Sequence, residues 1–168
     1  MFKWLILAFI MSSSAFAQSP QKPPPTAPPP TEYPPAEPIP PDVENVLFSF
    51  GEEMLIRINN VRLARKLPLL FKSDPAICAA GYQAAWLSET NTCNHIGRGK
   101  APLSTRLKLC GEKFSGSGEV VACGYVTAQH ALDAWLKSPG HAKIILNSNY
   151  TAFGAGFVDG QWVVVFTY

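Results

Sequence analysis

The chain of 168 residues carries 14 Lys and Arg against 12 Asp and Glu, for a formal net charge of +2. This balance argues against a nucleic-acid-binding protein, which usually concentrates basic residues on one face. Of the 16 prolines, twelve lie between residues 20 and 41, so the composition divides the chain into three parts.

Residues 1–17 have the pattern of a secretory signal peptide. Lys3 precedes an apolar run over residues 4–11, and the stretch ends in Ala-Phe-Ala at residues 15–17. A cation, a short apolar core and an A-x-A exit predict cleavage after residue 17. A membrane anchor is the alternative, but a spanning helix needs about 20 apolar residues. We expect no transmembrane segment in the rest of the chain.

Residues 18–41 combine many prolines with few side chains that could be buried. Runs such as residues 23–25 and 28–30, all proline, favour an extended polyproline II conformation with a rise of ~3.1 Å per residue. The alternative is a docking ligand for a proline-recognition domain, a mode that is less expected outside the cytosol. We therefore predict a spacer that holds the following domain away from a surface or cell-wall polymer.

Residues 42–168 have the size of one domain with its own core. All four cysteines of the chain lie there, and an even number behind a signal peptide predicts two disulfides. A zinc site is the cytosolic alternative, but it needs close thiol pairs, and these cysteines are separated by 15, 17 and 13 residues. Sequence leaves the pairing open. The position of two cysteines on either side of His95 favours Cys93–Cys110, which leaves Cys78–Cys123.

Two long segments predict helices in the first half of the domain. Apolar residues recur every three or four positions between Val43 and Val61, which predicts an amphipathic helix from Asp42 to about Arg65. Ser73, followed by Asp74 and a proline, is a typical helix start with a capping side chain. We expect the second helix to run from there through Leu87.

The second half of the domain predicts two more helices and a hairpin. Ser104 is a candidate cap for a short helix through Leu109, and Thr127 opens another through Trp135 that Pro139-Gly140 stops. Asp159-Gly160 then separates two apolar runs, residues 151–158 and 161–168, which is a strong signal for a β-hairpin.

The last apolar run contains no polar residue from Trp162 to Phe166. An unbroken run of this kind predicts a strand that is covered on both faces. Helices on both sides of a small sheet are therefore the expected architecture, an α+β fold.

Few residues of the domain have side chains that could bind a metal or transfer a proton at a site. His95 and His141 lie in sequence that resembles loops, and Glu119 follows Gly118, which would let the backbone bend. Two imidazoles and a carboxylate could bind zinc and leave a position for water, or form a proton-transfer pair in which Glu119 orients one ring. The third interpretation is that each is a separate structural residue, because nothing local brings them together. His130 is expected on a solvated helix face.

The domain resembles the CAP superfamily, which includes cysteine-rich secretory proteins (the SCP-like domain), and its bacterial branch in particular. The motifs that carry the resemblance are, in chain order, Ile58-Asn59-Asn60-Val61-Arg62, Asn94-His95-Ile96-Gly97, Pro102-Leu103-Ser104-Thr105-Arg106-Leu107, Gly118-Glu119 and Trp135-Leu136-Lys137-Ser138-Pro139-Gly140-His141. Each motif alone is weak, but their order and spacing are similar to those of the family.

This resemblance implies a three-layer α-β-α sandwich with a C-terminal β-hairpin and a cavity lined by two histidines and two acids. By motif, the histidines are His95 and His141, and the first acid is Glu119. The second acid is missing, because Lys137 and Ser138 stand at the matching stretch. The resemblance adds Ser138 to the residues that line the cavity, and it implies His95 and His141 as the ligands of a divalent metal such as zinc.

Two classes of function remain open. The favoured one is a secreted or cell-envelope binding module whose cavity takes a small apolar ligand or an envelope component, with a divalent metal not required. The alternative is an extracellular or envelope hydrolase, in which His95 or His141 acts as the base on a water and Glu119 orients the ring. A structural envelope protein, supported by the spacer alone, is a third interpretation. No catalytic residue is assigned, and the sequence does not predict the oligomeric state.

Overall fold

The structure, a computed structural model, describes residues 41–168, with side chains from residue 50 onward. The predicted signal peptide and the predicted spacer up to residue 40 lie outside the described residues. Pro41, the last residue of the predicted spacer, is the first residue of helix α1 (Pro41–Ala64).

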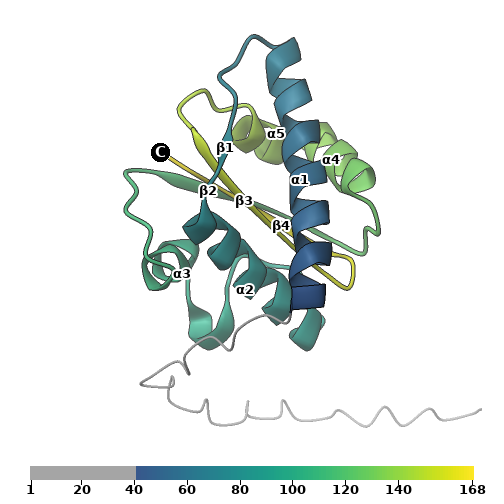
Figure 1. The fold of residues 1–168 in the computed structure, drawn as a ribbon, viewed down its shortest axis with the longest axis vertical. Coiled ribbons are helices and arrows are strands. Elements are labelled where there is room, and N and C mark those ends of the chain that lie inside the picture. The colour runs from purple at the N-terminus through teal and green to yellow at the C-terminus, as the bar shows by residue number, and fades with distance from the viewer. Residues whose placement is uncertain (1–40) are drawn as a thin grey trace, which may run out of the picture.

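Four strands form one sheet in the order β1-β3-β4-β2 (Figure 1). The strands are β1 (Phe71–Lys72), β2 (Ser117–Cys123), β3 (Ala152–Val158) and β4 (Gln161–Thr167). β1 pairs in parallel with β3, whereas β3 with β4 and β4 with β2 are antiparallel pairs. β2 and β1 are therefore the two edge strands, and β4 is a central one.

The hairpin predicted from Asp159-Gly160 is present between β3 and β4. Both turn residues have positive φ, 46° for Asp159 and 80° for Gly160, which is the backbone that an Asp-Gly turn supplies at low cost. The run from Trp162 to Phe166 is fully buried, as its unbroken apolar sequence predicts. Its side chains alternate between the two faces of the sheet, so both faces must be covered.

Helices cover both faces, which confirms the predicted α-β-α sandwich (Figure 1). On one face α1, α4 (Ala128–Lys137) and α5 (Pro139–Ile145) pack against the even-numbered side chains of β4. On the other face α2 (Asp74–Thr90) and α3 (Leu103–Leu109) pack against its odd-numbered side chains. A short 3-10 helix, η1 (Arg98–Lys100), lies between α2 and α3.

Two of the predicted helix starts are capped as expected. The side chain of Ser73 accepts a hydrogen bond from the backbone N–H of Ala76, and that of Thr127 accepts from the N–H of His130. The third prediction was wrong by two residues, because Pro102 is the N-cap of α3, and Ser104 lies inside the helix rather than at its cap.

The helix predicted from Thr127 ends before Pro139-Gly140, as expected, but a further helix that was not predicted begins there. α4 ends at Lys137, and after Ser138 alone the chain enters α5 with Pro139 as its first residue. Proline is well tolerated there because the first turn of a helix does not use its N–H groups. His141 therefore lies in a helix and not in a loop.

α2 approaches β3 closely because β3 has glycine where the two elements cross. A Cβ on Gly154 would lie 2.1 Å from the backbone of Ala76, and one on Gly156 would lie 2.6 Å from the backbone of Ala80. Glycine in β3 and alanine in α2 therefore allow the helix to pack directly on the sheet. This close packing sets the position of the end of α2, where the segment that carries His95 begins.

Both disulfides are present, but the predicted pairing was wrong. The bonds join Cys78 to Cys110 and Cys93 to Cys123, with Cα–Cα distances of 5.9 and 6.1 Å. The first ties α2 to the end of α3, and the second ties the segment before His95 to the end of β2. Cys110 lies against α2 rather than beside the His95 segment because α3 packs on α2. The positions of the cysteines in the sequence do not reveal this contact.

Candidate functional site

The polar residues that the sequence singled out lie around the edge strand β2. Glu119 is in β2 and is buried. His95 lies in the bend after α2, and His141 lies in the first turn of α5. α2 and α5 belong to opposite layers, so an edge strand is a place where residues from both layers can meet.

Glu119 bridges two cationic or protonatable groups. Its Oε1 lies 2.9 Å from Nδ1 of His95, and its Oε2 accepts a hydrogen bond of 2.7 Å from Nη2 of Arg106. The side chains of Glu119 and Arg106 are only 3% and 4% exposed. Because an ionised carboxylate can only accept, Nδ1 of His95 carries the proton and Nε2 is the ring nitrogen that a ligand can reach.

The two imidazoles have opposite pKa shifts. The hydrogen bond with Glu119 raises the pKa of His95, against the opposing effect of desolvation. Desolvation lowers the pKa of His141, and the charge of His95 lowers it further.

The segment that carries His95 is held by its own hydrogen bonds. Gln83, fully buried in α2, donates from Nε2 to the backbone oxygen of Asn94 at 3.0 Å, and Oδ1 of Asn94 accepts from the N–H of Ile96 at 2.8 Å. Gly97 packs against Gln83 and Arg106, and a Cβ there would lie 3.0 Å from each. With the Cys93–Cys123 disulfide, these contacts fix where the imidazole of His95 sits.

Gly118 does not bend the chain, contrary to the prediction. It lies within β2, and a Cβ there would lie 2.4 Å from the hydroxyl oxygen of Tyr150 and 3.0 Å from Ile144 of α5. The glycine therefore allows the phenol and α5 to approach the strand closely, beside the residue that bears the site carboxylate.

Ser138 and His130 take no part in the Glu119 bridge. Ser138 is the residue between α4 and α5, and its side chain makes no capping hydrogen bond with α5. His130 is exposed on α4, as predicted. At the stretch that would carry the second acid, the structure has Lys137 at the end of α4 and then Ser138.

The residues do not form a closed zinc site. Both oxygens of Glu119 are engaged, one by His95 and one by Arg106, which leaves the two imidazoles as donors. Within residues 50–168, no group of three or more His, Cys, Asp or Glu side chains is arranged to hold a metal ion. Structural zinc sites use four protein ligands and catalytic sites use three.

Arg106 is the site residue that sequence reasoning missed. It was noted only as part of a family motif, although its position carried a signal. Leu103, Arg106 and Leu107 are spaced as one face of a helix, and the face is buried, so the cation must enter the core with a partner. That partner is Glu119, and Arg106 also donates from Nη1 to the backbone oxygen of Ala79 at 3.1 Å.

The α-β-α sandwich with two disulfides is the fold that the sequence motifs predict. The family model of the cysteine-rich secretory protein family, CAP, matches residues 55–168. The chain therefore belongs to the CAP family, as its motifs indicate.

Similar proteins come from bacteria. The uncharacterized membrane protein YlbC of Bacillus subtilis is 32% identical over 113 residues, which make up 67% of this chain and 32% of that protein. The uncharacterized protein YkwD of the same bacterium is 40% identical over 53 residues, 32% of this chain and 21% of that protein. The chain thus spans about a third or less of the curated relatives that it matches.

Solved structures share the fold. An extracellular protein with an SCP domain from Bacillus anthracis has a TM-score of 0.71 and 26% identity, over 79% of this chain and 45% of that one. An outer surface protein from Borrelia burgdorferi has a TM-score of 0.63 and 23% identity, over 69% of this chain and 90% of that one. The second likeness concerns the fold alone.

The two disulfides indicate an oxidising compartment, because cytosolic thiols are kept reduced. This agrees with a secreted or cell-envelope protein. Within residues 41–168, no helix has both the length and the apolar character needed to cross a membrane.

Proposed function

We propose that the chain is a binding module that acts outside the cytosol and takes a small ligand at His95 and His141. The observation that supports this proposal is the bridge from Arg106 through Glu119 to His95, with contacts of 2.7 and 2.9 Å. A buried ion pair is used here to hold one exposed ring in a single orientation, which is the arrangement that a recognition site needs.

The exposure of His95 favours binding over catalysis. Its side chain is 55% exposed, so water reaches the ring from outside while the carboxylate behind it stays dry. Electrostatic catalysis depends on excluding water from the reacting groups, whereas recognition of a hydrogen-bonding group does not. The neighbouring Ile96 is 48% exposed and offers apolar contact area. The ligand therefore combines an apolar part with a hydrogen-bonding group, as expected of a small apolar ligand or an envelope component.

Benzoate is a suitable first probe, because it joins an apolar ring to an acceptor for the Nε2–H that His95 carries when its imidazole is protonated, a state that the raised pKa of His95 favours. We expect it to shift the imidazole resonances of His95 and His141 in the full chain. His95→Ala and His141→Ala should abolish binding, and His130→Ala is the matched control because His130 is an exposed histidine on α4. Binding that survives loss of both His95 and His141 would contradict the proposal.

A divalent metal such as zinc would be held by the two imidazoles alone, with Glu119 keeping Nε2 of His95 unprotonated and turned outward. Two protein ligands give a weak and exchangeable site rather than a resident cofactor. We expect zinc to bind to the full chain in calorimetry and to be lost in His95→Ala. Purified protein with stoichiometric zinc that resists chelation would contradict a weak site.

One observation favours the alternative of a hydrolase. Opposite pKa shifts in neighbouring groups are typical of an acid and a base, and here the pKa of His141 is lowered and that of His95 raised. His141 would take a proton from water as the hydroxide attacks a carbonyl, and protonated His95 would give its proton to the leaving group. Turnover of an activated ester that is lost in His141→Ala but kept in His130→Ala would favour this reaction over simple binding.

A further inference from the structure

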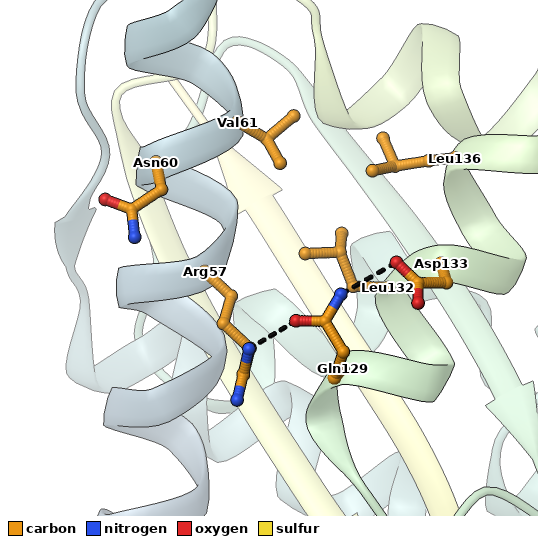
Figure 2. Close-up of a pocket in the computed structure, with 7 residues that line it drawn as sticks. All are labelled: Arg57, Asn60, Val61, Gln129, Leu132, Asp133 and Leu136. Atoms are coloured by element: carbon orange, nitrogen blue, oxygen red, sulfur yellow. Dashed lines mark hydrogen bonds between the residues drawn. The ribbon is translucent and has the colours of Figure 1, made fainter.

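A groove lies between α1 and α4, on one face of the sandwich (Figure 2). Its volume is about 190 Å³. An apolar cavity of about 150 Å³ accommodates a benzene-sized molecule, and drug-sized ligands need roughly 300 Å³ or more. The groove therefore suits a small molecule or a single side chain. Its lining residues are Arg57, Asn60, Val61, Gln129, Leu132, Asp133 and Leu136.

The groove has an apolar floor and a polar rim. Val61 from α1 and Leu132 and Leu136 from α4 supply the apolar side chains. Figure 2 shows Gln129 between a cation and a carboxylate of the rim: its Oε1 accepts from Nη1 of Arg57, and its Nε2 donates to Oδ1 of Asp133 at 2.7 Å. The rim is thus a chain of hydrogen bonds that crosses from one helix to the other.

The two charged residues of this rim, Arg57 and Asp133, differ in whether an opposite charge lies beside them. Arg57 already has an anionic partner, because Glu53 lies one turn earlier on α1 and accepts from its Nε at 2.7 Å. Asp133 accepts only from the neutral amide of Gln129. Among the side chains described from residue 50 onward, none of the ion pairs within 4.0 Å includes Asp133. The uncompensated charge at the groove is therefore negative.

We propose that the α1/α4 groove binds the alkylammonium group of a small organic cation. The ammonium donates to the carboxylate of Asp133, and the alkyl chain lies over Val61, Leu132 and Leu136. A charge-assisted hydrogen bond to a carboxylate is stronger than one between neutral groups, and the chain removes apolar surface from water at the same time. This site is separate from His95 and does not depend on the proposed function.

An anionic ligand of the same shape is excluded by the same charges. Its carboxylate would face Asp133, and it could use Arg57 only by displacing Glu53 from that guanidinium. Hexylamine and hexanoate are therefore a matched pair of probes, since they have equal chains and opposite charge.

We would titrate the full chain with each probe and follow the side-chain amide resonances of Gln129, whose N–H donates to Asp133. Hexylammonium should shift them with a dissociation constant on the order of 1 mM, as expected for a ligand of this size. Hexanoate should not. Equal binding of both probes, or binding of neither, would overturn the proposal.

Variants test separately the charge of Asp133 and the apolar floor of the groove. Asp133→Asn keeps the acceptor for Gln129 and should weaken hexylammonium binding about tenfold or more. Asp159→Asn is the matched control, because it removes a carboxylate in the β3–β4 turn, where asparagine also tolerates positive φ. Leu136→Ala is a second variant that keeps the charge, and it should reduce the gain in affinity from propylamine to hexylamine. Unchanged binding in Asp133→Asn contradicts the assignment.

The alkylammonium could belong to a free amine or to a lysine side chain of a polypeptide. Nα-acetyl-lysine N-methylamide tests the second source, because its backbone is neutral and its only charge is the side-chain ammonium. If it binds at least as well as hexylamine, the groove accepts a lysyl side chain. If only hexylamine binds, the ligand is a free amine. Both results support the ammonium site.

Discussion

Replacing Arg106 by methionine removes the cation that faces Glu119 in the core. The pair is a 2.7 Å contact between side chains that are 4% and 3% exposed, so solvent cannot take over the role of the guanidinium. Loss of one partner of a buried pair costs about 3–5 kcal/mol in unfolding free energy. For a domain of this size that corresponds to a melting temperature lower by roughly 10–20 °C. Chemical and thermal denaturation followed by circular dichroism measures both quantities.

The double variant Arg106→Met, Glu119→Gln isolates the cause. It removes the buried charge that the single variant leaves uncompensated, so it should be more stable than Arg106→Met alone. A second readout is the pKa of His95, which the charge of Arg106 lowers in the native protein. That pKa should rise in Arg106→Met. A loss below about 1 kcal/mol, as for exposed pairs, together with an unmoved His95 pKa, would refute the assignment of Arg106 as the support of the site.

Three further variants test how the fold and the site are held. Arg62→Met should lower the unfolding free energy by about 3 kcal/mol or more. The buried guanidinium donates to four backbone carbonyls, which the variant would leave without this partner. A loss under about 1 kcal/mol in urea unfolding would contradict this. Removing the Cys93–Cys123 disulfide with Cys93→Ser and Cys123→Ser should lower the unfolding free energy by about 3–4 kcal/mol. It should also let the pKa of His95 fall toward its usual value. A pKa that stays raised in NMR titration would show that this disulfide does not hold His95 in place. Gly154→Ala should lower the unfolding free energy by roughly 1–3 kcal/mol, because the new Cβ meets the backbone of α2. Thermal unfolding measures this change. An unchanged melting temperature would contradict the close approach of α2 to β3.

The sequence predicted those parts of the fold that local chemistry specifies. Ser73 and Thr127 start helices because their side chains satisfy an unpaired backbone N–H, and Asp159-Gly160 forms a hairpin because both residues accept positive φ. The unbroken apolar run of β4 predicted its two covered faces for a similar reason, since each residue reports on its own burial.

The features that were missed depend on contacts between segments that are distant in the sequence. Gly118 reads as a turn residue, but it is in a strand because the phenol of Tyr150 needs the space. The disulfide pairing follows from how α3 packs on α2, which spacing does not encode. For the site, the motif named His95 and Glu119, but their contact and the role of Arg106 required the tertiary structure.

The pKa of His95, measured by NMR titration of its ring in the full chain, tests the central claim most directly. Because Glu119 raises it above the usual 6.5, the contact adds stability that is complete below pH 6.5 and is lost as the pH rises through the pKa of the folded state. We predict that His95 titrates above His141, with its proton on Nδ1 in the neutral form, and that Glu119→Gln lowers its pKa. A His95 that titrates at its usual value and ignores Glu119→Gln would contradict the account.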